Sequence, residues 1–142
     1  MNPRVLLLSF AALGIFAGGY WAGSSRTALA ASSRVYELRV YHTYPGKLDG
    51  LLARFRDHTM TIFERHGMKN VGYWRPIAEP EKGKTLYYII SHESREAADA
   101  NWKAFRDDPE WKKVQSASEA NGKLVEKVDS TYLEPTDFSQ IK

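Results

Sequence analysis

The sequence predicts an α+β protein built on a ferredoxin-like four-stranded antiparallel sheet with helices on one face. Two observations carry this prediction. Apolar residues switch along the chain between a period of two, typical of strands, and steps of three and four, typical of helices. The segments defined in this way follow the order strand, helix, strand, strand, helix pair, strand, which is the order of a split βαβ unit. A length of 142 residues suits one such domain.

The first strand is predicted at residues 35–42, where β-branched and aromatic residues alternate with polar ones. Alternation places Tyr36, Leu38, Val40 and His42 on one face, and Val35, Glu37, Arg39 and Tyr41 on the other. We expect the first, mostly apolar set to pack against helices. The second set then faces away from the helices. Pro45 and Gly46 end the strand.

A long helix is predicted next, at residues 47–66, from one stripe of apolar residues at three- and four-residue steps. Gly67 suits its end. Residues 69–76 and 85–92 predict two strands that pair across a polar loop. Ser94 and Asp108 are predicted N-caps of a helix pair, at residues 94–107 and 108–121. A fourth strand is predicted at residues 124–134, before Pro135.

The third strand, TLYYIISH, is apolar on both of its faces, which indicates a strand covered on both sides. Helices cover only one face of this sheet. We expect the other face to carry Tyr41, Trp74 and Tyr88, which a monomer rarely exposes together. The sequence therefore predicts a homodimer packed sheet to sheet around a cavity.

Residues 1–30 are predicted to be a signal peptide, with residues 31–142 as the domain. A positive start precedes an apolar run, and Ala28-Leu29-Ala30 fits a cleavage site. The predicted location is the periplasm or outside the cell. The alternative is an uncleaved anchor in the inner membrane, because residues 5–23 approach the ~20 residues that span a bilayer; its glycines weaken that interpretation.

Charge and cysteine content exclude several classes of function. The formal net charge is +3, but Arg4 and Arg26 lie in the leader, which leaves 18 basic against 17 acidic residues, a net charge of +1. Nucleic acid is therefore not an expected partner, because phosphate contacts need clustered positive charge. The sequence contains no cysteine, which excludes disulfides, thiolate metal sites and cysteine nucleophiles.

The candidate ligand-binding residues are assigned to the cavity between the sheets: Glu37, Arg39, Tyr41, Trp74, Tyr88 and His92. Arg39 can hold an anion bidentately, and Trp74 and Tyr88 can stack on a flat ligand. Glu37 or His92 can move protons. The alternative is structural: Glu37 and Arg39 pair across strands, and the aromatic residues form the dimer core.

The four histidines predict no metal site. His42, His58, His66 and His92 share no short ligand spacing. His58 and His66 lie on one helix about 12 Å apart, at 1.5 Å per residue, which is too far for one ion. Trp102 and Trp111 fall at helical spacing and are expected in the core rather than in a cofactor site.

Five motifs resemble the NIPSNAP family in the same order along the chain. They are YELRVYHTYPGK from Tyr36, ERHG from Glu64, VGYW from Val71, DPEW from Asp108 and LEPTDFS from Leu133. The resemblance implies a dimeric α+β barrel and leaves the biochemical activity open. Relatives often carry His-Leu-Trp-x-Tyr where this chain has YIISH from Tyr88 to His92, which implies a differently shaped cavity.

The hypothesis of choice is a homodimer that binds a small ligand or a protein partner without catalysis and without a cofactor. The alternative is an enzyme, because the broader barrel group includes cofactor-independent monooxygenases and haem-handling proteins; haem is then the possible cofactor. A third hypothesis is an interaction module tethered by an uncleaved leader, which is the one expected membrane contact.

Overall fold

The computed structural model describes residues 34–142, so the expected leader and its cleavage site after Ala30 lie outside the described residues. The elements in chain order are β1 (Val35–Thr43), α1 (Leu48–Arg54), the π-helical turn η1 (Phe55–Thr59), α2 (Met60–Arg65), β2 (Lys69–Trp74), β3 (Thr85–His92), α3 (Arg95–Asp107), α4 (Pro109–Ser118) and β4 (Val125–Leu133). No helix among residues 34–142 is long and apolar enough to cross a bilayer.

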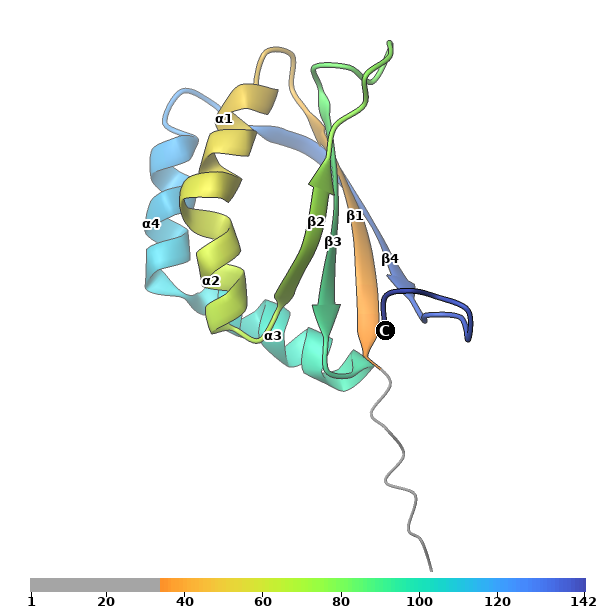
Figure 1. The fold of residues 1–142 in the computed structure, drawn as a ribbon. Helices are drawn as coiled ribbons and strands as arrows, with labels where there is room; N and C mark the ends of the chain where they lie inside the picture. Colours follow the sequence, from red (N-terminus) through yellow and green to blue (C-terminus); the bar gives the residue numbers. More distant parts are fainter. Residues whose placement is uncertain (1–33) are drawn as a thin grey trace, which may run out of the picture.

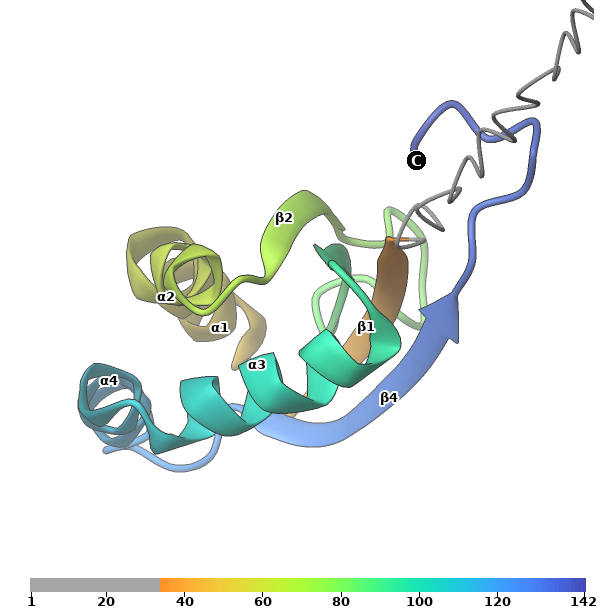
Figure 2. The ribbon, with the colours of Figure 1, turned by 90° about the horizontal axis from the view of Figure 1, so that it is seen from below.

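The strands form one antiparallel sheet in the order β2-β3-β1-β4. All helices lie on one face of this sheet, as Figure 1 shows. Seen from below, α3 crosses in front of β1 and runs alongside β4, and α4 lies further from the sheet (Figure 2). This arrangement confirms the predicted α+β, ferredoxin-like fold class.

Local chemistry explains where the helices begin and end. The Ser94 hydroxyl accepts a hydrogen bond from the amide of Ala97 at 3.1 Å and caps α3. Asp108 caps α4 through the amides of Glu110 and Trp111. Gly67 follows α2 with a φ of +76°, a conformation that favours glycine. Both predicted caps and the predicted stop are confirmed.

The long helix differs from its prediction by one π-helical turn. In η1 the amide of Met60 bonds to the carbonyl of Phe55, five residues back. The Thr59 hydroxyl donates to the Arg54 carbonyl at 3.1 Å. Phe55 and Thr59 of η1 are buried, together with Ile62 and Phe63 of α2.

The expected facing of β1 is wrong. Tyr41 packs edge-on against Phe55 of η1 with 5.7 Å between ring centroids, and Glu37 bonds to Trp102 of α3. The polar set Glu37, Arg39 and Tyr41 therefore faces the helices. The apolar set of Tyr36, Leu38, Val40 and His42 lies on the opposite, open face. The reason is that the buried charge of Glu37 is fully paired beneath the helices, so hydrophobicity alone misassigned the face.

Trp74 is also misassigned. Its neighbour Tyr73 stacks on Tyr88 in the core, with ring centroids 5.3 Å apart. Alternation along β2 then places Trp74 on the open face, where its ring lies over Gly72, close enough that any Cβ there would collide. Trp74 is 54% exposed, whereas Tyr88 is fully buried. The two rings do not share one surface.

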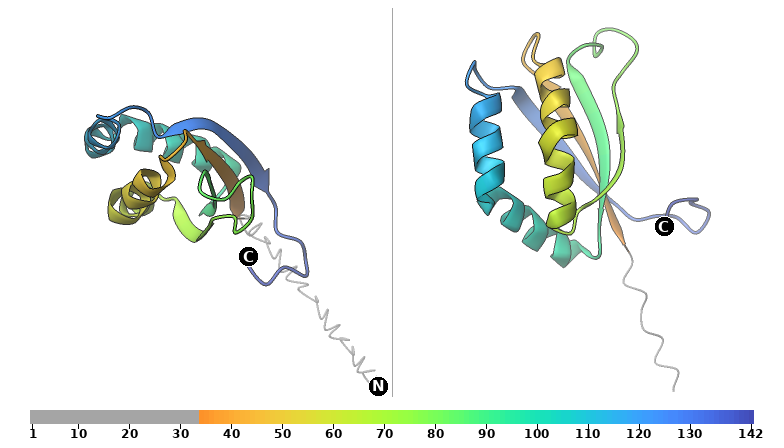
Figure 3. Two further views of the ribbon diagram at one scale, coloured as in Figure 1. Left: turned by 90° about the horizontal axis from the view of Figure 1, so that it is seen from above. Right: turned by 60° about the vertical axis from the view of Figure 1, so that its left-hand side comes forward.

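The open face is partly covered at one end. The segment after β4 folds back so that Pro135 and Ile141 line a small hollow of about 300 Å³ with Tyr36 and Ile89. Both views in Figure 3 show this segment beside the sheet, away from the helices. The remaining open face carries half-buried apolar side chains from β1 and β3: Leu38, Val40, Tyr87 and Ile89.

Candidate ligand-binding groove

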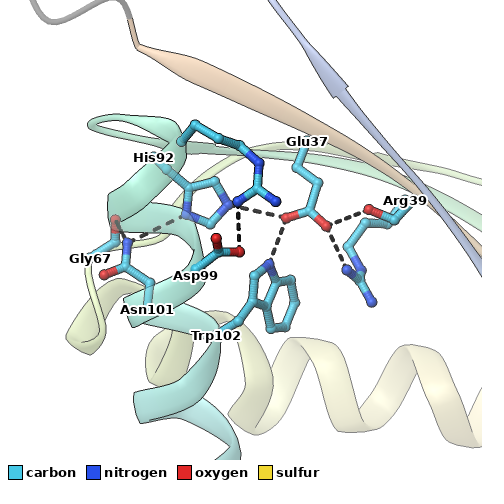
Figure 4. A network of polar contacts seen from close by, with 9 residues as sticks. Glu37, Arg39, Gly67, His92, Asp99, Asn101 and Trp102 are labelled. Atoms are coloured by element: carbon cyan, nitrogen blue, oxygen red, sulfur yellow. Dashed lines mark hydrogen bonds and ion pairs between the residues drawn. The ribbon is translucent and has the colours of Figure 1, made fainter.

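Glu37 is the centre of a buried polar network (Figure 4). Its Oε1 atom accepts hydrogen bonds from Arg39 Nη1 at 2.5 Å and from Ser130 Oγ at 2.6 Å. Its Oε2 atom accepts from Trp102 Nε1 at 2.6 Å and lies 3.2 Å from His92 Nε2. The carboxylate thus joins β1 to β3, β4 and α3.

The network fixes the charge of Glu37. Its side chain is only 1% exposed. Burial raises the pKa of this carboxyl, but the hydrogen bonds from His92, Ser130 and Trp102 and the charge of Arg39 outweigh burial and lower the pKa to about 2. Glu37 is therefore an ionised structural acceptor at neutral pH and a weak base.

Both ring nitrogens of His92 are engaged. Nε2 faces Glu37, and Nδ1 lies 3.4 Å from the side-chain amide nitrogen of Asn101, which also donates to the carbonyl of Gly67 at 3.2 Å. The side chain is fully buried. With Glu37 against one ring nitrogen and Asn101 against the other, His92 offers no free nitrogen to a metal ion or to haem iron in this geometry.

A groove of about 1060 Å³ opens beside this network, between β1 and β4 on one side and α3 and α4 on the other. Its aromatic lining comes from all four elements: Tyr41, Trp102, Phe105, Trp111 and Tyr132. Arg39 is the polar link between the network and the groove. Its guanidinium carbon lies 4.3 Å from the ring centroid of Trp102 and 5.5 Å from that of Tyr41.

The groove carries more positive than negative charge. Its basic residues are Arg39, Lys103, Arg106 and Lys112, and its acidic residues are Glu37 and Asp99. Both acids have partners, because Glu37 pairs with Arg39 and Asp99 pairs with Arg95 at 2.6 Å. Lys103 also has a partner, Asp107 at 2.7 Å, so the excess positive charge of the groove comes from Arg106 and Lys112. The arrangement suits a flat ligand with an acidic group.

The structure brings five of the six candidate residues together on one face of the sheet. Glu37, Arg39 and Tyr41 line the groove, and Tyr88 and His92 are buried behind it. Trp74 does not join them. The groove lies between the sheet and the helices, so these residues do not line a space between two sheets.

The groove residues from α3, α4 and β4 were not predicted. One stripe of α3 carries charged residues at helical spacing beside Trp102: Asp99, Lys103 and Arg106. This stripe is the pattern in the sequence that could have indicated a binding surface on α3. Trp102 is buried as expected and Trp111 is half-buried, and both rings line the groove.

The other histidines have local roles. His42 Nε2 lies 3.0 Å from Asp129 Oδ2, and His66 Nε2 lies 2.6 Å from Asp108 Oδ2. His58 lines a separate hollow between the helices. Within residues 34–142, no cluster of three or more histidine or acidic side chains is placed to hold a metal ion.

Comparison with known proteins gives a family. The sequence model of the NIPSNAP family matches residues 36–140. No curated protein matches the chain.

Solved structures match over most of the described chain. One is an uncharacterised NIPSNAP-like domain protein from Burkholderia xenovorans, 18% identical, with 76% of this chain and 90% of that chain covered and a TM-score of 0.66. Another is a NIPSNAP family protein of unknown function from Agrobacterium tumefaciens, 20% identical, with 78% and 96% covered and a TM-score of 0.66. SnoaB, a cofactor-independent oxygenase from Streptomyces nogalater, is 13% identical, with 78% and 99% covered and a TM-score of 0.51. At identities this low, the structural similarity establishes a shared fold alone.

Proposed function

The chain belongs to the NIPSNAP family, and from that premise we propose that it binds a small organic molecule in the groove between β1, β4, α3 and α4. The observation that carries the proposal is the composition of the groove, which combines five aromatic side chains with an excess of basic ones. Binding pockets of this kind pair apolar walls with a few polar groups that orient the ligand.

Ligand binding accounts for the groove better than catalysis does. Glu37 is held ionised with a pKa of about 2, and a general base works best with a pKa near the working pH. His92 is enclosed by Glu37 and Asn101. An oxygenase-like or haem-handling activity is the alternative. Arg39 and Tyr41 already line the groove, whereas ligation of haem iron by His92 needs a movement that frees one of its ring nitrogens.

We test the proposal by native mass spectrometry of the protein purified from its source compartment. We expect extra bound mass in the wild type and its loss in Trp111→Ala, which removes a groove wall. Trp74→Ala, on the opposite face, is the matched control and should retain the ligand. Equal retention by both variants, or the absence of bound mass from the wild type, contradicts the proposal.

A further inference from the structure

Among residues 34–142, three buried side-chain polar atoms lack a hydrogen bond of normal geometry, and two of them belong to neighbours: Nε of Arg39 and the hydroxyl of Tyr88, whose nearby hydrogen-bonding group is Tyr41. Arg39 on β1 and Tyr88 on β3 lie directly opposite each other in the sheet. Both side chains point toward the helices. Because an unsatisfied buried donor is destabilising, two of them side by side indicate a position suited to an acceptor atom.

Tyr41 separates these donors from the groove. Its ring packs edge-on against Tyr88 with centroids 5.3 Å apart, and the guanidinium carbon of Arg39 lies 5.5 Å from the centroid of the same Tyr41 ring. Tyr41 lines the groove, whereas Tyr88 does not. A rotation of the Tyr41 ring is therefore the movement that opens both donors to a molecule in the groove.

The hydroxyl of Tyr88 stays protonated at neutral pH. Burial raises the pKa of this phenol well above its usual value. The hydroxyl thus remains a donor across the physiological range. Arg39 supplies a second donor whose direction is fixed by the ion pair between its Nη1 atom and Glu37.

Resting on the ligand-binding function proposed above, we infer that Arg39 and Tyr88 form an oxygen-binding subsite behind Tyr41. The ligand class is an aromatic acid. One carboxylate oxygen accepts hydrogen bonds from Arg39 Nε–H and Tyr88 O–H, and the ring lies against Trp102 and the other aromatic walls.

The test is isothermal titration of the purified protein with 2-naphthoate and with its uncharged analogue 2-naphthamide. We expect the wild type to prefer the acid, and Tyr88→Phe to bind the acid about 10- to 100-fold more weakly, the effect of losing a hydrogen bond to a charged group. Amide binding should weaken less, because the amide carbonyl oxygen accepts the same hydrogen bonds without a charge. Tyr73→Phe is the matched control, because its ring stacks on Tyr88 but its hydroxyl already bonds to Asn70.

The outcomes separate the two proposals. Equal affinity for acid and amide, or an acid affinity unaffected by Tyr88→Phe, overturns the subsite and leaves the groove proposal standing. Failure of both compounds to bind overturns the binding function and the subsite with it. Tyr88→Phe should change the melting temperature little, because the hydroxyl that it removes makes no hydrogen bond of normal geometry. Arg39→Lys, which keeps the charge but lacks Nε, should reproduce the loss of preference for the acid.

Discussion

Glu37 organises the residues around it more than any other side chain near the groove. Its carboxylate accepts hydrogen bonds from donors on β1, β4 and α3 and lies against His92 on β3. Glu37→Gln keeps the shape of the side chain but replaces one carboxylate oxygen, an acceptor, by an amide nitrogen, a donor. That donor then faces the donors that surround Glu37. We expect it to lower the free energy of unfolding by about 3 kcal/mol, as for breaking a buried ion pair. Urea denaturation measures this, and exposed Glu126→Gln is the control, with a change within about 0.5 kcal/mol.

The same carboxylate predicts how stability depends on pH. Its pKa falls from 4.5 to about 2 on folding, so the unfolded chain binds the proton more tightly. The stability that Glu37 contributes is complete above the unfolded pKa and is lost as the pH falls through the folded pKa. We expect the wild type to lose stability between about pH 5 and pH 2, and Glu37→Gln to show a flatter curve. Equal slopes for the two proteins in acid would contradict this.

At the residue scale, the sequence grouped Glu37, Arg39 and Tyr41 correctly because side chains alternate along a strand. It assigned the group to the wrong side of the sheet. Charged residues normally indicate an exposed face, and the donors that make burial of Glu37 possible, Trp102 and Ser130, lie 65 and 93 positions away in the chain. Local alternation carries no information about such distant partners.

Asp108 is the junction between α2, α3 and α4. One oxygen caps α4, and the other accepts from Arg65 at 2.8 Å and lies 2.6 Å from His66. Asp108→Ala should lower the melting temperature and speed amide exchange at Trp111. Asp108→Asn keeps a capping oxygen and should have a smaller effect. If the two variants lose the same stability, the ion pairs rather than the cap dominate.

At the element scale, the order and ends of helices and strands were predicted well, because caps, glycines and hydrophobic periods are local signals. The π-helical turn η1 was not predicted. A regular α-helix and a helix with one π-helical turn both place Phe55 and Thr59 on the same face. The spacing of apolar residues in the sequence therefore does not distinguish an α-helical turn from a π-helical one. The hydrogen bond from Thr59 to Arg54 makes the difference visible in the structure.

At the scale of the whole molecule, the leader is a prediction that rests on residues 1–30, outside the described range. We expect N-terminal sequencing of the protein from its source compartment to begin at Ala31, since Ala28-Leu29-Ala30 fits a cleavage site. A mature chain that begins at Met1 would favour the uncleaved anchor and locate the groove at the inner membrane.

The open sheet face leads to the last prediction, a homodimer packed through that face. Tyr41 and Tyr88, which were expected on this face, instead lie on the side of the sheet that the helices cover. The face still carries Leu38, Ile89 and the 54% exposed Trp74, and an apolar patch on a sheet is typical of an interface.

A second copy is the occupant that fits this face. The rim of the face carries charges of both signs, because Lys127 and Asp129 lie on it and pair at 2.8 Å. Two copies related by a two-fold axis can therefore bring their apolar patches together without repulsion between like charges. Light scattering after size exclusion should give twice the mass of one chain. Leu38→Glu should give a folded monomer, and Thr61→Glu, on the exposed side of α2, should remain dimeric. A wild-type monomer would contradict the interface and would leave the groove, which one chain forms by itself, as the only functional surface proposed for this fold.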